Sequence, residues 1–363
     1  MAQIELRSLA KSYKTGKVLD GLSLSVDEGE IVCVFGPSGA GKTVLLRLIA
    51  GVEELDAGSI FLEGRDVTEA PPETRGVGIA FQNFALFPHM SAFDNIGSAL
   101  TARGASKATI KAKVEKVASL LKISHVLGHA PRELSNGQKQ RTALARALAA
   151  DPKIVLLDDP LRNVDAKLRY EMRLELPSLL RASGATVLYV TQDYKEAMAI
   201  GDRIAVLLDG RFEQIAKPSA IYRDPTSMGV ARLFGDPTIN LIPIRPRAGD
   251  GGTLCEIGGA TVALGASHAA AAGRAVLLGL RPEALQVTDA AGADGFPVEV
   301  IAVTPLNEKT VLLMRTPEGQ EIFASEAGVE NEARRPGPAF AHFDPARALA
   351  FDEASGTRIG GGA

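Results

Sequence analysis

One loop motif constrains this chain more than any other feature of its sequence. Residues 36–43 read Gly-Pro-Ser-Gly-Ala-Gly-Lys-Thr, after an apolar run at residues 31–35 and before a helical pattern at residues 44–50. A P-loop has this pattern and this strand–loop–helix context, because its glycines let backbone N–H groups close around a phosphate. We therefore predict a nucleotide-binding loop formed by Gly36, Pro37, Ser38, Gly39, Ala40, Gly41, Lys42 and Thr43. The alternative is a glycine-rich turn that holds no ligand.

The end of this loop and a later strand predict how ATP and Mg²⁺ would be held. Lys42 would reach the β- and γ-phosphates, Thr43 would bind the metal, and the helix N-terminus would favour an anion. Asp158 ends an apolar run at residues 154–157, where a P-loop site needs a carboxylate for Mg²⁺. Asp159 follows, placed to act as a general base on the attacking water. Without the P-loop, two such acids would be turn or helix-cap residues.

The pattern of the chain changes near residue 235. Before that point, short β-rich runs alternate with helical stretches, which indicates an α/β domain with a largely parallel sheet over residues 1–235. A helical insertion interrupts this domain at about residues 83–150. One helix of the insertion shows apolar residues at helical spacing, namely Ile110, Val114, Val117 and Leu121. Residues 236–363 carry β-like runs broken by Gly, Pro and Asp, and predict a small, mostly β domain.

Charge and hydropathy limit the classes of partner that this chain could bind. The formal net charge is -3, and residues 236–363 hold 10 Lys and Arg against 16 Asp and Glu, so no basic field would attract nucleic acid. No apolar run approaches the roughly 20 residues that span a bilayer. We therefore expect no nucleic-acid partner, and a cytoplasmic protein whose membrane role comes through another subunit. Cys33 and Cys255 belong to no metal-binding cluster, and we expect reduced thiols.

A second motif brings a family resemblance. Residues 134–138 read Leu-Ser-Asn-Gly-Gln, and the strand ending in Asp158 follows 20 residues later. This order resembles the signature and Walker B motifs of the ABC ATPases, which implies a P-loop ABC cassette with a helical insertion. In that family two cassettes pair head to tail, so that each ATP lies between one P-loop and the partner's signature. The resemblance assigns this signature to Ser135, Asn136, Gly137 and Gln138, which alone would form a turn and a helix N-cap.

Three other residues match this family in order. Tyr13 matches the aromatic residue that stacks on adenine, although a solitary Tyr is otherwise a packing residue. Gln82 matches the glutamine that contacts Mg²⁺ and the water, and Asp165 matches the loop that crosses the dimer interface.

The resemblance narrows to the maltose-importer branch. Residues 71–78 and 84–90 are similar to that branch, and residues 278–283 to its C-terminal, OB-like regulatory domain. This implies an importer ATPase for carbohydrates or polyols, glycerol-type solutes included, peripheral at the cytoplasmic face of the bacterial inner membrane. It also implies two permease subunits and, indirectly, an external solute-binding protein. A groove for a permease helix would be lined by Phe84, Leu86, Phe87 and Met90, which would otherwise pack inside the insertion.

Two residues near the reacting phosphate depart from the family. Asp159 stands where the family has a catalytic Glu, and Gln192 where it has a switch His. The Asp carboxylate is drawn back by roughly 1 Å, and misplacement on that scale can cost about 10²-fold in rate. Gln192 can hydrogen-bond a phosphate but carries no positive charge. We therefore predict slow hydrolysis at this chain's own site, and an intact signature that serves a second, non-identical ATPase subunit.

Two alternatives use the β domain differently. One is a non-transport ABC ATPase whose β domain binds nucleic acid. The presence of a single cassette and the acidic balance of residues 236–363 argue against it. The other is a regulator whose β domain senses a metabolite or holds a signalling protein.

Overall fold

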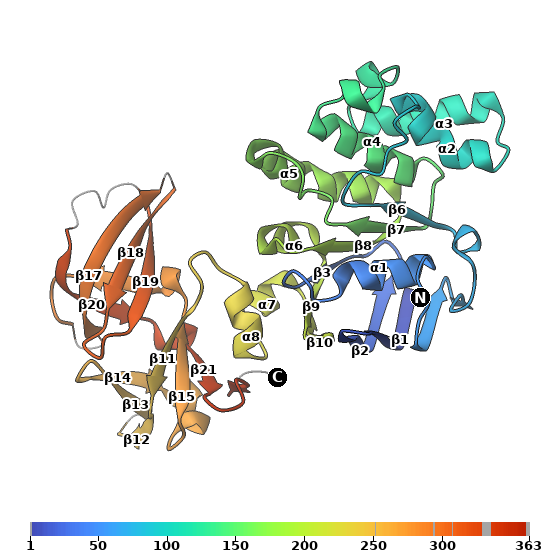
Figure 1. Ribbon diagram of the computed structural model, residues 1–363. Helices are drawn as coiled ribbons and strands as arrows, with labels where there is room; N and C mark the ends of the chain where they lie inside the picture. The colour runs from blue at the N-terminus through green and yellow to red at the C-terminus, as the bar shows by residue number, and fades with distance from the viewer. Residues whose placement is uncertain (1, 251, 293–294, 307, 329–334, 361–363) are drawn as a thin grey trace. The chain divides into compact units, whose positions relative to one another are not determined.

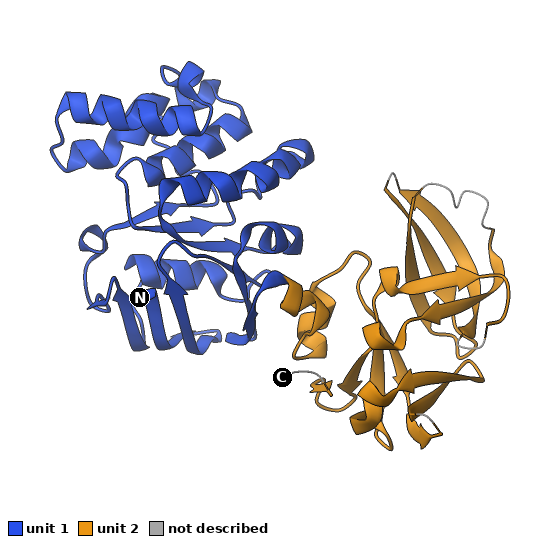
Figure 2. Cartoon of the chain, turned by 180° about the vertical axis from the view of Figure 1, so that it is seen from behind, with its two compact units in different colours: residues 1–218 blue, residues 219–363 orange. Residues whose placement is uncertain are grey.

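The chain forms two compact units in a computed structural model that describes residues 2–250, 252–292, 295–306, 308–328 and 335–360. Unit 1 comprises residues 1–218 and unit 2 residues 219–363 (Figure 2). Unit 1 has the α/β class that we predicted, and unit 2 is mostly β. None of the helices formed by the described residues combines the length and apolar character that crossing a bilayer requires.

Six strands of unit 1 form its main sheet, and these are β3 (Ile31–Phe35), β6 (Val77–Ala80), β7 (Ile154–Asp158), β8 (Thr186–Thr191), β9 (Arg203–Leu208) and β10 (Arg211–Ala216). Their order is β10-β9-β3-β8-β7-β6, with β10 antiparallel at one edge and the others parallel (Figure 1). Strands β3, β7 and β8 are buried along their whole length. Parallel strands covered on both faces read as continuous apolar runs, which is why the sequence pattern located them.

A second, antiparallel sheet departs from the largely parallel pattern that we predicted. Its strands are β1 (Ala2–Tyr13), β2 (Gly16–Asp27), β4 (Ala57–Leu62) and β5 (Arg65–Asp66), in the order β2-β1-β4-β5. Helix α1 (Lys42–Ala50) lies between the two sheets (Figure 1). Apolar side chains from both sheets and from α1 form one buried cluster. This cluster fixes the helix that begins at the end of the predicted P-loop.

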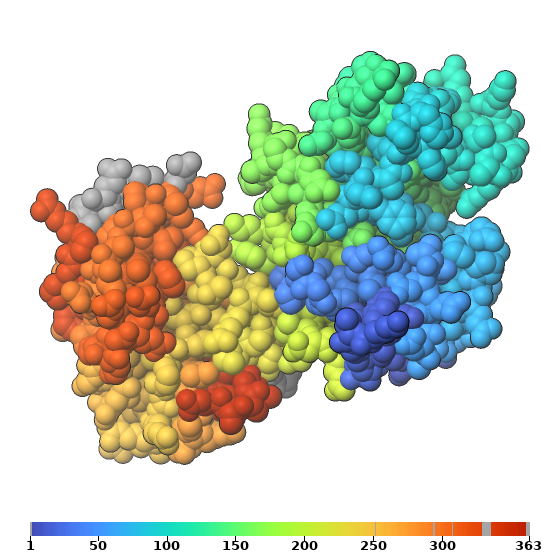
Figure 3. Space-filling view, viewed as in Figure 1, coloured from blue at the N-terminus to red at the C-terminus, as the bar shows by residue number. Residues whose placement is uncertain are grey.

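The helical insertion forms a separate part of unit 1. The insertion contains α2 (Ala92–Ala102), α3 (Lys107–Leu120) and α4 (Asn136–Leu148), with short 3₁₀ turns at Ser124–Val126 and Pro131–Glu133. In the space-filling view these segments gather at one end of the unit, away from the N-terminal strands (Figure 3). Helices α5 (Ala166–Ser183) and α6 (Tyr194–Ile200) follow β7 and β8.

We expected the first domain to end at residue 235, but unit 1 ends earlier, at residue 218. Helices α7 (Pro218–Arg223) and α8 (Met228–Leu233) belong to unit 2. The buried Arg281 side chain donates hydrogen bonds to the carbonyl oxygens of Tyr222 and Phe234, at 2.7 and 2.5 Å. The Met228 N–H also bonds the Gly356 carbonyl at 2.8 Å. Long-range contacts therefore place these helices with the β domain, and a pattern based on local composition does not reveal such contacts.

The described residues of unit 2 form three antiparallel sheets. The first, in the order β11-β15-β21-β22, is formed by Asn240–Ile244, Val276–Leu280, Leu349–Asp352 and Arg358–Ile359. The second, β12-β13-β14, is formed by Arg247–Gly249, Gly252–Ile257 and Ala260–Gly265. The third, β16-β20-β17-β18-β19, is formed by Leu285–Thr288, Gly337–Phe343, Gly295–Leu306, Lys309–Arg315 and Glu321–Ala327. Apolar side chains from all three share one core.

A buried arginine completes the end of helix α1. Arg75 donates hydrogen bonds to the carbonyl oxygens of Leu48 at 2.8 Å and Ile49 at 3.0 Å. The last carbonyls of a helix lack partners within the helix. Arg75 supplies a donor to the Ile49 oxygen and a second donor to the Leu48 oxygen, which also accepts from the Gly51 N–H. Its other nitrogens bond the carbonyl oxygens of Ala70 and Thr68 at 2.8 and 3.0 Å. The guanidinium thus joins the P-loop helix to the segment before β6.

Replacing Arg75 with Ala should destabilise unit 1, because four carbonyl oxygens each lose a charged donor, and within the described residues only the Leu48 oxygen keeps a second bond, from the Gly51 N–H at 3.1 Å. We expect a loss of about 2–4 kcal/mol in the free energy of unfolding. Urea titration followed by circular dichroism measures it. Arg132→Ala is the matched control, because Arg132 is exposed and has no side-chain hydrogen bond with the described residues. Equal stability of the two variants would contradict this role.

Candidate nucleotide-binding site

The predicted P-loop connects the buried strand β3 to helix α1. Gly41 precedes the helix with φ 98°, a left-handed conformation that favours glycine. A Cβ at Gly41 would also lie 2.6 Å from Leu19 Cδ2. The loop therefore needs glycine here for conformation and for space. Its helix has no acidic residue in the first turn, so the exposed N–H groups and the helix dipole are left for an external anion.

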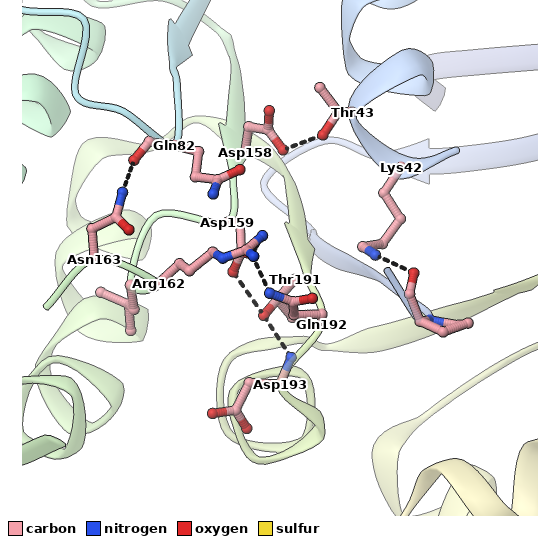
Figure 4. Close-up of polar contacts among 12 residues, drawn as sticks. Lys42, Thr43, Gln82, Asp158, Asp159, Arg162, Asn163, Thr191, Gln192 and Asp193 are labelled. Atoms are coloured by element: carbon pink, nitrogen blue, oxygen red, sulfur yellow. Dashed lines mark hydrogen bonds and ion pairs between the residues drawn. The ribbon is translucent and has the colours of Figure 1, made fainter. Parts of the chain in front are cut away.

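The side chain of Lys42 reaches back across the P-loop. Its Nζ donates hydrogen bonds to the carbonyl oxygens of Gly36 and Pro37, both at 2.8 Å (Figure 4). Burial lowers the pKa of Lys42, while the charges of Asp159 and Asp158 act to raise it. The ammonium group is therefore held in position, close to two carboxylates, where a phosphate would supply further negative charge.

The carboxyl end of β7 brings Asp158 against the start of α1. Thr43 Oγ1 donates a hydrogen bond to Asp158 Oδ1 at 3.1 Å. Burial raises the pKa of Asp158, and its hydrogen bond with Thr43 opposes that shift. No group of three or more His, Cys, Asp or Glu placed to hold a metal ion by themselves occurs among the described residues. A hydroxyl and one carboxylate nevertheless fit Mg²⁺, which commonly takes one or two protein oxygens together with substrate phosphates and waters.

Asp159 begins the turn after β7 with φ 44°, which is uncommon for a residue with a side chain. Gln192 Nε2 donates to its Oδ2 at 3.2 Å, and the Arg162 guanidinium lies 3.7 Å from the same oxygen (Figure 4). The Thr191 hydroxyl is 3.5 Å from Oδ1. Burial raises the pKa of Asp159, against the positive charges of Arg162 and Lys42. The carboxylate is therefore already held by neighbours of the same chain.

These groups share one cavity of about 300 Å³. The predicted residues that line it are Ser38, Gly39, Gly41, Lys42, Thr43, Gln82, Asp158, Asp159 and Gln192. Val18 and Arg162 also line the cavity, and neither was predicted from the sequence. The sequence did offer a signal for Arg162, because a basic residue three positions after Asp159 can pair with its carboxylate. Asn163, also not singled out, donates its amide to the Gln82 carbonyl oxygen at 2.8 Å and joins this strand end to the loop after Asp159.

The predicted signature lies elsewhere, at the start of α4. Ser135 is the helix N-cap and accepts a hydrogen bond from the Gln138 N–H at 3.3 Å, while the Gln138 side chain accepts one from the Ser135 N–H at 2.9 Å. A Cβ at Gly137 would lie 2.2 Å from Leu168 Cδ2. These residues and the exposed Asn136 do not line the P-loop cavity. The turn-and-cap interpretation thus describes their contacts within one chain.

Two other predicted residues also make local contacts. Asp165 is the N-cap of α5 and accepts a hydrogen bond from the Leu168 N–H at 2.9 Å. Tyr13 is 41% exposed at the end of β1, and its hydroxyl bonds the Glu53 carboxylate. The Lys11 ammonium lies 5.5 Å from the centroid of its ring, and Tyr13 does not line the P-loop cavity.

A buried acid beside the site escaped the sequence analysis. Glu196 on α6 is 1% exposed and accepts hydrogen bonds from Tyr189 at 2.8 Å and Thr191 at 2.9 Å. Burial raises its pKa to about 7, and the charges of Asp193 and Asp159 act in the same direction. The Thr191 hydroxyl contacts both Glu196 and Asp159, and so connects the two carboxyl groups.

The parallel sheet, the phosphate loop and the paired acids define an ATP-binding cassette of the ABC type. The chain belongs to the ABC transporter family, whose model matches residues 19–162, and a TOBE domain model matches residues 278–351. Both the resemblance to the carbohydrate-importer branch and the predicted fold class are confirmed. Family members of this kind are ATPases coupled to transport.

Curated relatives cover most of this chain. It is 45% identical over 300 residues to the sn-glycerol-3-phosphate import ATP-binding protein UgpC of Ruegeria sp., covering 83% of this chain and 82% of that protein. It is 39% identical over 340 residues to the alpha-glucoside transport ATP-binding protein AglK of Rhizobium meliloti, covering 92% and 93%. A solved post-hydrolysis dimer of an ATP-binding cassette with ADP and Pi superposes with a TM-score of 0.54 at 31% identity, covering 59% of this chain and 98% of that one.

Replacing Glu196 with Gln should change how stability depends on pH. Because its folded pKa, about 7, lies above the ordinary value of 4.5, the folded state keeps a proton that the unfolded state releases. The stability contributed by this group is therefore largest below pH 4.5 and is lost as pH rises to about 7. We expect the stability of Glu196→Gln relative to the parent to increase by about 1–3 kcal/mol from pH 4.5 to pH 8.

Thermal unfolding across this pH range measures the effect. Glu171→Gln is the control, because Glu171 is exposed on α5 and should give a constant difference from the parent. A pH-independent difference for Glu196→Gln would contradict the buried, proton-holding role.

Proposed function

We propose that this chain is the ATP-binding motor subunit of an ABC importer for carbohydrates, polyols or their phosphates. Family membership and the complete P-loop site, in which Thr43 meets Asp158 at 3.1 Å, support this most directly. The names of the relatives, sn-glycerol-3-phosphate import and alpha-glucoside transport, support the solute class. The subunit works with two transmembrane permeases at the cytoplasmic face of the inner membrane, and with a solute-binding protein through them.

ATP would lie with its phosphates on the loop at residues 36–43 and its adenine against Tyr13. Thr43, Asp158 and Gln82 would hold Mg²⁺, which supplies positive charge to the phosphates when bound. Lys42 would neutralise the β- and γ-phosphates, leaving the carbonyl oxygens that it now bonds. Asp159 would orient the attacking water and accept its proton.

The hydrolysis site of this chain would be slow. Asp159 has a short side chain, and its carboxylate is held by Gln192 at 3.2 Å and by Arg162 at 3.7 Å. A water molecule must compete with both groups for this acceptor. The Gln192 amide, directed at Asp159, is uncharged and gives a γ-phosphate less stabilisation than a cation would.

The partner ATPase would be a different protein with a stronger site. The signature residues Ser135 and Gly137 lie at the N-terminus of α4, outside this chain's own cavity, where a phosphate from another subunit could meet them. The loop around Asp165 would cross the interface. A pair with one slow and one fast site uses both the weakened acid and the complete signature, whereas a homodimer would carry two slow sites.

Restoring the family residues should accelerate hydrolysis. We expect Asp159→Glu combined with Gln192→His to raise the rate of phosphate release from the purified chain at least about tenfold, since general acid–base groups contribute about 10²–10⁴-fold. Asp159→Asn is the matched control and should lower the rate. Brisk turnover by the unmodified chain, or no gain in the double variant, would contradict the slow-site proposal.

In the assembled transporter, two substitutions separate this chain's own site from the partner's. Ser135→Arg should stop hydrolysis at the partner's P-loop, whereas Lys42→Ala should leave that site active. ATPase measurements on the purified complex distinguish them. Equal loss from the two substitutions in a complex of two different ATPases would contradict the division of labour.

A cavity of about 570 Å³ lined by strand β6 and the helical insertion is the candidate docking surface for a permease. Phe87, Ala99 and Arg146 are among the residues that line it. Phe87 is 42% exposed, yet its backbone N–H and carbonyl are both bonded to the buried Asn95 side chain, at 2.7 and 3.1 Å. Arg146 lies 5.8 Å from the Phe87 ring and bonds the Phe84 carbonyl oxygen at 2.9 Å. A fixed backbone with an exposed ring suits docking of an apolar helix.

The lining differs in part from the one that we predicted. Phe87 lines the cavity, but Phe84, Leu86 and Met90 are half-buried and do not. The chain turns at Phe84 and Ala85, where φ is 62° and 46°, a conformation that is uncommon for residues with a side chain.

Phe87→Ala should reduce solute uptake by the assembled transporter about tenfold or more, because an exposed apolar anchor is lost. The thermal stability of the subunit should be unchanged, because the bonds of Asn95 to the backbone remain. Uptake into proteoliposomes and thermal unfolding test the two expectations. Leu174→Ala removes a similarly exposed apolar side chain, 65% exposed on α5, and serves as the control. Normal uptake by Phe87→Ala would contradict docking at this ring.

A further inference from the structure

Unit 2 contains a cavity of about 550 Å³ that the nucleotide site does not use. Its basic side chains come from separate parts of the chain: the end of α7, the segment after β15, a 3₁₀ turn at Pro345–Arg347, and β22. They are Arg223, Arg281, Arg347 and Arg358, and we call this the arginine cavity. Tyr222, Ala284, Ala346 and Leu349 form less polar parts of its wall. Convergence of four guanidinium groups on one hollow is the starting observation.

Arg281 builds the wall of the arginine cavity. Its nitrogens donate to the Tyr222 and Phe234 carbonyl oxygens, and its guanidinium lies 3.7 Å from the centroid of the Tyr222 ring. The Tyr222 hydroxyl in turn bonds the Glu283 carboxylate. This chain of contacts fixes an aromatic face and occupies one of the nearby carboxylates. The wall is therefore ordered by buried contacts within unit 2.

Arg358 is largely buried and poorly satisfied. Its Nε is shielded from solvent and has no hydrogen-bond partner among the described residues. Asp224 forms a long ion pair with Arg358, in which its carboxylate oxygen lies 3.8 Å from this Nε, beyond hydrogen-bond distance. Its only hydrogen bonds within the described part of the chain are long ones, from one terminal nitrogen to the Ala350 and Ile359 carbonyl oxygens at 3.3 and 3.4 Å. Burial lowers the pKa of Arg358. An anion near this group would compensate a charge that the chain balances incompletely.

The remaining two arginines are available to a ligand. Arg223 and Arg347 are exposed, and neither makes an ion pair within the described ranges of the chain. Four arginines and one acid, Glu283, line the arginine cavity, and Asp224 pairs with Arg358 beside it, so the local balance is positive. Residues 219–363 as a whole hold 12 Lys and Arg against 17 Asp and Glu, a net charge of -5. The cavity is thus a positive site in an acidic unit.

We propose that the arginine cavity binds a small organic anion that carries a phosphate or carboxylate group. Guanidinium forks match the paired oxygens of both groups, and several arginines around one hollow favour such a ligand over a neutral one. The cavity has the volume typical of small-molecule sites, and the Tyr222 ring and Leu349 offer a face for the carbon skeleton. The inference concerns unit 2 alone and does not depend on the solute or on the hydrolysis rate.

Calorimetric titration of the full-length protein tests this proposal. The P-loop also attracts phosphates, so every titration uses the Lys42→Ala background. The probes are glucose 6-phosphate, citrate and neutral glucose. We expect saturable binding of at least one of the two anions, weakened by added salt, and none of glucose. The anion that binds identifies whether a phosphate or carboxylates are preferred.

The double variant Arg223→Ala/Arg347→Ala should bind that anion at least about tenfold more weakly, because two charged hydrogen-bond donors are lost. Both side chains are exposed, so the fold should persist. The variant Arg232→Ala/Arg315→Ala removes the same charge at exposed positions of unit 2 outside the cavity and should bind normally. The proposal fails if neither anion binds, if glucose binds as well as they do, or if both double variants bind equally.

Discussion

The parallel pairing of β3, β8 and β7 is the constraint on which the site depends. Parallel strands end at the same edge of a sheet, so the P-loop after β3, Asp158 at the end of β7 and Gln192 after β8 meet there although the sequence separates them widely. The Thr43–Asp158 hydrogen bond then joins the loop to the neighbouring acid. No residue of the site could keep its geometry if this pairing slipped by one position, because alternate side chains would exchange faces.

Sequence reasoning found the elements whose signal is local. The buried strands are continuous apolar runs, and α3 shows helical spacing that buries Val114 and Val117. The P-loop and the paired acids follow because their chemistry fixes both residue type and spacing. The resemblance to a known family added the C-terminal domain, in which the TOBE match begins at residue 278, where the resembling run also begins.

Features that depend on contacts between distant segments could not be predicted from the sequence. Arg75 looks like any polar turn residue until α1 places two carbonyl oxygens beside it. Glu196 sits in a helical pattern whose burial depends on β8 and α6 packing together. Similarly, α7 and α8 have ordinary helical composition, and only their bonds to residues such as Arg281 assign them to unit 2. Local patterns carry no information about such partners.

The absence of a Cβ at Gly137 allows Leu168 of α5 to lie against the first turn of α4. Leu168 is six residues from Arg162, which faces Asp159, and its N–H bonds the cap residue Asp165. One short stretch of backbone therefore contacts both the acid after β7 and the first turn of α4. Because its two ends are only six residues apart, a shift of the acid would be transmitted along the backbone to the α4 cap. Residues 162–168 thus act as a mechanical link between the nucleotide cavity and the start of α4.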